Sequence, residues 1–228
     1  MKLFFTLLTL TLILSCGNDA NKPSKLSTGD SIAAAYGDYA KQEFTLSDAT
    51  TKFLWRDRQF VADLGDTFSV LVLNDAYTAN INDAERAALG YVATFIGNEC
   101  QWDGEGKEDR SNLKCKILSQ LNLGYQCSAQ HLDFLRYWFR NDPKALESLQ
   151  NCPTTPDGAT IQETFDEITV RTKGDIISVK YNVSGMNMRE GEEWHYTQKD
   201  HFSFSKNQLK LVKQEKSDVV SESMGDMN

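Results

Sequence analysis

The spacing of apolar residues changes from a helical to an alternating pattern near residue 160. Upstream of it, apolar side chains recur every three or four positions, which is typical of helices packed on a core. Downstream they alternate with polar residues, most clearly at Ile177, Val179, Tyr181 and Val183, which is typical of strands with one wet face. This order predicts an α+β fold, with N-terminal helices packed on a C-terminal four-stranded antiparallel meander sheet.

Start and stop signals place the individual elements. Residues 47–65 are expected to form a helix, because four apolar residues share helical spacing: Phe53, Phe60, Val61 and Leu64. The uncharged run 68–73 predicts a short buried strand. Capping residues or a proline predict further helices over 83–97, after Asn82, over 112–121, after Ser128 and from Pro143. The four strands of the meander are expected around 168–170, 177–183, 194–204 and 209–211.

The N-terminus carries a short apolar run, Leu3–Leu14, after Met1 and Lys2. As a helix it would span about 18 Å, whereas a bilayer core is roughly 30 Å thick, so it predicts a cleaved signal peptide and not a membrane span. Ile13-Leu14-Ser15-Cys16 resembles the lipobox of bacterial lipoproteins. The alternative is an ordinary signal peptide that a cysteine follows by chance.

The lipoprotein resemblance covers residues 1–16 only, and it implies where in the cell the protein is located. Cys16 would be the mature N-terminus and would carry the lipid anchor, which places the protein in the bacterial cell envelope. Gly17, where an Asp often retains such proteins at the inner membrane, favours the outer membrane. The domain scheme is then a signal peptide (1–15), a lipidated Cys and flexible tether (16–45), one α+β domain (helical part 46–156, sheet part 157–216) and a disordered tail (217–228).

Four cysteines remain after Cys16, and an even number in an exported protein predicts two disulfides. We favour Cys100–Cys115 and Cys127–Cys152, because each pair would close a short loop around helices. A zinc site is disfavoured because the cysteines lack close C-x-x-C spacing. A catalytic cysteine is disfavoured by the even count, and free buried cysteines remain an alternative.

Charge limits the partners of the protein. The net charge of −8 becomes −9 when Lys2 is removed with the signal peptide, which argues against nucleic acid and anionic lipid surfaces. The expected partners are the membrane, through the lipid anchor, and another envelope protein. We expect no cofactor and no metal; the weak calcium candidates are loop residues that match the EF-hand pattern poorly, Asp103, Glu105, Glu108 and Asp109.

Two sets of residues are candidates for function. A hydrolase site is conceivable near His195, Asp200 and His201, although the two histidines would share a strand face about 20 Å apart, and the chain has no G-x-S-x-G, H-E-x-x-H or phosphate-binding motif. A binding surface is expected instead from aromatic, methionine and charged residues, namely Trp194, Tyr196, Met186, Met188 and Arg189. The leading hypothesis is a lipid-anchored, non-catalytic binding or accessory module. An envelope hydrolase and a small-ligand-binding lipoprotein are the alternatives.

Overall fold

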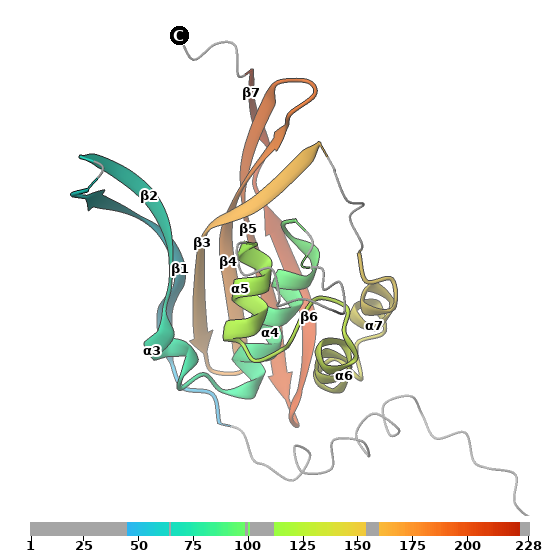
Figure 1. The fold of residues 1–228 in the computed structure, drawn as a ribbon. Helices are drawn as coiled ribbons and strands as arrows, with labels where there is room; N and C mark the ends of the chain where they lie inside the picture. The colour runs from blue at the N-terminus through green and yellow to red at the C-terminus, as the bar shows by residue number, and fades with distance from the viewer. Residues whose placement is uncertain (1–44, 64, 99, 101–111, 154–159, 224–228) are drawn as a thin grey trace, which may run out of the picture.

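A computed structural model describes residues 45–63, 65–98, 100, 112–153 and 160–223 (Figure 1). Its main feature is a seven-stranded antiparallel sheet with the strand order β2-β1-β3-β4-β5-β6, in which β7 also pairs with β5. The helices are short. The elements, in chain order, are β1 Ala49–Val61, β2 Asp66–Leu73, α3 Asp75–Thr78, α4 Asp83–Phe95, α5 Leu113–Gln120, α6 Ala129–Trp138, α7 Pro143–Gln150, β3 Ile161–Lys173, β4 Ile176–Asn187, β5 Glu192–Ser205, β6 Gln208–Lys216 and β7 Val220–Ser223.

The predicted fold class is wrong, because the sheet has seven strands and begins before the helices. Residues 49–61, expected to be helical, form β1, which pairs with β2 on one side and β3 on the other. The register shifts between Lys52 and Leu54, and both Phe53 and Leu54 are fully buried. A bulge of this kind interrupts the alternation of apolar and polar residues by which a strand is recognised in a sequence. The remaining apolar residues then fit a helical spacing.

The meander β3–β6 and the helices after residue 82 agree with the prediction. Ile177, Val179, Tyr181 and Val183 are buried on the face that the helices cover. The helices begin at capped positions: side chains of Asn82, Asn112, Ser128 and Asp142 each accept a hydrogen bond from the backbone N–H three residues on. Local chemistry therefore fixes where these elements start.

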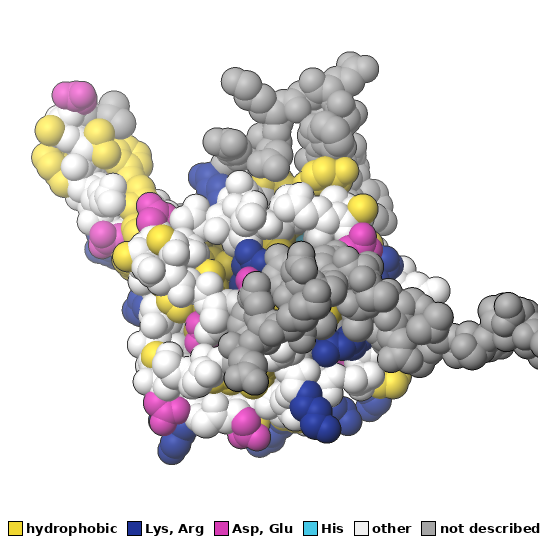
Figure 2. All heavy atoms as spheres, turned by 90° about the horizontal axis from the view of Figure 1, so that it is seen from below, with side chains coloured by type: hydrophobic (Ala, Val, Ile, Leu, Met, Phe, Trp, Pro, Cys, Tyr) yellow, Lys and Arg dark blue, Asp and Glu magenta, His cyan; other side chains and the backbone are white. Residues whose placement is uncertain are grey.

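The β1–β2 hairpin projects from the body of the molecule (Figure 1). β2 was expected to be buried, but it is the edge strand, and Phe68 is 40% exposed. Phe60 on β1 is 66% exposed, and Figure 2 shows hydrophobic side chains gathered along this projection. The correction follows from topology: an apolar run indicates a strand but does not say whether the strand lies inside a sheet or at its edge.

The C-terminal tail is also more ordered than predicted. Val220–Ser223 form β7, which pairs with Glu192–His195 of β5. β6 pairs with β5 only from Gln198 onward, so the N-terminal part of β5 is left with a free edge. β7 pairs with that edge. The polar composition of the tail hides this pairing, because backbone groups make it.

Both predicted disulfides are present. Cys100–Cys115 joins the segment after α4 to α5, and Cys127–Cys152 brackets the hairpin of α6 and α7. Within the described ranges no helix is long and apolar enough to cross a membrane. The signal peptide, Cys16 and the tether lie outside the described residues, so they stay predictions.

Besides the two disulfides, a buried histidine links α6 to neighbouring parts of the chain. His131 of α6 is fully buried; its Nδ1 accepts a hydrogen bond from the backbone N–H of Cys127 at 3.1 Å. Its Nε2 lies 3.0 Å from Thr94 Oγ1, and that hydroxyl donates to the carbonyl of Gly90 at 2.7 Å. His131 therefore donates through Nε2 and is neutral. Burial, and then the charge of Lys114, lower the pKa of His131 to about 4.

Candidate functional site

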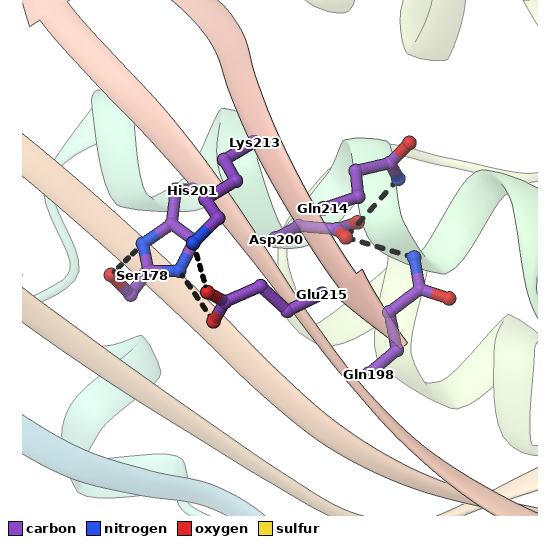
Figure 3. Close-up of polar contacts among 7 residues, drawn as sticks. All are labelled: Ser178, Gln198, Asp200, His201, Lys213, Gln214 and Glu215. Carbon is purple, nitrogen blue, oxygen red and sulfur yellow. Dashed lines mark hydrogen bonds and ion pairs between the residues drawn. The ribbon is translucent and has the colours of Figure 1, made fainter. Parts of the chain in front are cut away.

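The residues expected for a hydrolase lie on opposite faces of the sheet. Asp200 points towards the helices and is 2% exposed (Figure 3). It accepts hydrogen bonds from Tyr181 Oη at 3.1 Å, Gln198 Nε2 at 2.8 Å and Gln214 Nε2 at 3.1 Å. These three donors satisfy a buried carboxylate, which makes Asp200 a structural residue and no partner of His201.

This arrangement predicts a loss of stability when Asp200 is changed. Asp200→Ala is expected to lower the free energy of unfolding by about 2 kcal/mol, because the Tyr181 hydroxyl is left without its acceptor in the core. Denaturant unfolding of the full chain measures the loss. Asp175→Ala, at an exposed position of the β3–β4 turn, is the matched control and should change stability by less than about 0.5 kcal/mol. Equal effects of the two variants would contradict the structural role.

His201 lies on the other face, in a chain of polar contacts. Its Nδ1 is 3.0 Å from Ser178 Oγ, and its Nε2 is 3.3 Å from Glu215 Oε2 (Figure 3). The hydrogen bond from Lys213, and then that from His201, lower the pKa of Glu215. Hydroxyl, imidazole and carboxylate in this order are the components of a nucleophilic triad.

The surroundings of Ser178 do not complete such a triad. Ser178 lies in β4, which is paired with β3 and β5 on both sides, so neighbouring strands engage its backbone. An oxyanion site needs free N–H donors close to the nucleophile. None of the cavities described below is lined by Ser178, His201 or Glu215. The cluster is therefore a set of polar contacts on the open face of the sheet.

His195 is distant from both groups. The pairs Ser184–His195 and Ser178–His201 are six residues apart along β4 and β5, which corresponds to about 20 Å on one face. The structure thus keeps His195, Asp200 and His201 apart, as the spacing of the histidines predicted. The three do not form one catalytic site.

Three cavities meet instead at the first half of β3. Their volumes are about 230, 320 and 540 Å³, and Asn98 and Glu163 line all three. They exist because β1 pairs only with the second half of β3, from Glu167 onward, which leaves the edge at Glu163 open. Asn98 occupies that edge: its N–H donates to Glu163 O at 3.1 Å, and its Oδ1 accepts from Glu163 N at 3.0 Å.

The largest of these three cavities lies between the helices and the sheet, and we call it the inner cavity. Its walls combine apolar side chains with a few polar ones, as in many small-molecule sites. The carboxylate of Glu163 accepts hydrogen bonds from Tyr196 Oη at 3.0 Å and from Gly97 N at 3.4 Å. Burial, and then the charge of Glu163, raise the pKa of Tyr196, which keeps its hydroxyl protonated. The lining residues include Phe95, Lys114, Gln126, Ile161, Glu163 and Trp194.

The cavity of about 230 Å³, which we call the outer cavity, follows the strand register. One row of paired residues crosses four strands: Gln162, Met186, Glu193 and Glu222. Two residues further along β3, β4 and β5, a second row on the same face consists of Thr164, Ser184 and His195. All seven of these residues line the outer cavity.

Gly185 and Trp194 lie between the two rows and face the opposite side. They are paired across β4 and β5, and a Cβ on Gly185 would lie 2.3 Å from Trp194 Cε2. Only glycine lets the indole pack directly on the strand. Gly185 and Trp194 thus form a thin partition, and Trp194 lines both the inner and the outer cavity.

Sequence reasoning found part of this site. Trp194 and Met186 line cavities, and Tyr196 supports the site through Glu163. Met188 is 59% exposed and Arg189 is exposed at the β4–β5 turn; neither lines a described cavity. Asn98 and Glu163 were missed, because nothing in the chain shows which half of β3 lacks a neighbour. A glycine inside an alternating strand, Gly185, was the one available signal.

Metal binding gains no support from the described residues, which contain no group of three ligand side chains able to hold an ion. The weak calcium candidates Asp103, Glu105, Glu108 and Asp109 lie outside the described residues. No known protein family, curated protein or solved structure matches the chain.

Proposed function

We propose that this protein is a lipid-anchored binding protein of the bacterial cell envelope, and that it holds a small ligand in the cavities around Glu163 without transforming it. The observation that carries the proposal is the convergence of three cavities on the part of β3 that β1 leaves unpaired. Aromatic, aliphatic and polar side chains share these walls, which suits recognition of a small molecule.

The lipid anchor rests on the resemblance of residues 13–16 to a lipobox. Two disulfides fit an exported protein, since such bonds persist in oxidising compartments. A binding role without chemistry is supported by the separation of His195, which lines the outer cavity, from Asp200 and His201, which line none of the three cavities described above. Ser178, the hydroxyl beside His201, also lines none of them.

Mass spectrometry of the full chain, expressed in a bacterium and extracted from its membranes, tests both parts. Under denaturing conditions we expect a polypeptide that begins at Cys16 and carries acyl chains, and a Cys16→Ser variant without them. Under native conditions we expect an additional small molecule that denaturation releases. Equal native and denatured masses would contradict the binding proposal, and an unacylated mature chain would contradict the anchor.

Docking of another envelope protein is the second candidate, and one feature favours it. The projecting β1–β2 hairpin exposes Phe60, Val61 and Phe68, and β2 has a free edge. Free edges and exposed apolar side chains are used for strand-to-strand recognition. Crosslinking in native membranes, with Phe60→Ser as the comparison, would detect such a partner.

A further inference from the structure

We infer that the outer cavity binds an organic cation, an ammonium group with a small apolar substituent. The inference rests on the proposed function and names the class of ligand for that same site. It is carried by the shape of the cavity, by the charge of its walls and by the apolar surface beside the charges.

The charge of the walls is one-sided. Glu193 and Glu222 are paired directly across β5 and β7, and like charges in that position destabilise a sheet. Neither forms an ion pair with any residue in the described part of the chain. No Lys or Arg is present among the described residues that line the cavity. A bound cation would offset the electrostatic repulsion between the carboxylates of Glu193 and Glu222.

The apolar surface beside the charges suits an alkylated cation. Met186 is the cross-strand neighbour of Glu193, so its flexible thioether lies next to that carboxylate in the same row. Trp194 also lines the cavity, but its indole packs over Gly185 on the opposite face, so the apolar group beside the carboxylates is the side chain of Met186. Carboxylates next to a thioether favour a cation that also carries methyl or alkyl groups. The volume of about 230 Å³ limits the ligand to a small molecule.

Choline and its uncharged isostere 3,3-dimethylbutan-1-ol are the probes, since they share a shape and differ in charge. Isothermal titration calorimetry of the full chain is expected to show choline binding about tenfold or more tightly than the alcohol. Glu193→Gln/Glu222→Gln should weaken choline binding about tenfold and leave the alcohol unchanged. Glu192→Gln is the control, because this neighbour on β5 does not line the cavity.

The outcomes separate this inference from the proposed function. Equal binding of choline and the alcohol, or an unchanged affinity in the double variant, would overturn the cationic ligand. If neither probe binds while a releasable ligand is found in the native protein, the class is wrong and the binding function stands. If no ligand is found and choline still binds through Glu193 and Glu222, the cation site is supported by itself.

Discussion

Removal of the Cys127–Cys152 disulfide is expected to lower the free energy of unfolding by about 3.5 kcal/mol. The bond closes a loop of 25 residues, and the entropy that such a loop denies to the unfolded chain has this size. Its loss also loosens the backbone of Cys127, which donates to His131. Denaturant unfolding of Cys127→Ser/Cys152→Ser, compared with wild type at pH 7, measures the effect.

The second disulfide provides the internal comparison. Cys100–Cys115 closes a loop of 15 residues, so Cys100→Ser/Cys115→Ser should cost about 3 kcal/mol by the same entropy. Losses below about 1 kcal/mol in both double variants would show that neither loop is constrained in the way described. A loss confined to the Cys127 pair would assign the effect to the His131 contact.

Acid is expected to destabilise the protein through His131. The pKa is about 4 in the folded state and near 6.5 in the unfolded chain, so between these values the unfolded state binds more protons. The contribution is complete above pH 7, falls as the pH drops through 6.5 and has lost about 3 kcal/mol by pH 4. Burial of the ring, and then the charge of Lys114, disfavour the protonated imidazole in the folded state, which explains the direction.

A variant in which residue 131 cannot titrate separates the contribution of His131 to the pH dependence of stability from the contribution of the carboxylates. His131→Gln keeps a polar side chain but has no proton to gain between pH 7 and 4. Its stability at pH 7 should be lower than that of wild type, and the gap should close as the pH falls. Urea unfolding at half-unit pH steps gives both curves. Parallel curves would mean that His131 is not held neutral.

The chain predicts those parts of the fold that depend on local chemistry. Caps at Asn82, Asn112, Ser128 and Asp142 act within one turn, so they can be read without tertiary information. The alternation in β4 is equally local, because one face meets the helices and the other meets solvent. The cysteine pairs followed from loop lengths around helices that were themselves correctly placed.

Errors arose where non-local pairing decides the structure. β1 was taken for a helix because its bulge hides the period of two, and β3 has a similar shift between Phe165 and Glu167. β7 owes its existence to a free edge of β5, and the paired residues run from His195 with Val220 to Glu192 with Ser223. Such edges are properties of the assembled sheet.

The candidate site shows the same division. Trp194 and Met186 were identified by residue type, since aromatic and thioether groups are typical of binding surfaces. Asn98 and Glu163, where the cavities meet, were not, because their position depends on β1 leaving half of β3 unpaired. Residue types in the sequence can therefore indicate which side chains line a cavity, whereas the pairing of the strands determines where the cavity lies.

A matched pair of substitutions tests the central claim, ligand binding at β3, most directly. Met186→Trp would fill the outer cavity, whereas Met188→Trp adds the same side chain at an exposed position two residues away. We expect native mass spectrometry to show the releasable ligand in wild type and in Met188→Trp, and its loss in Met186→Trp. A ligand retained equally by both variants, or absent from all three proteins, would contradict the account.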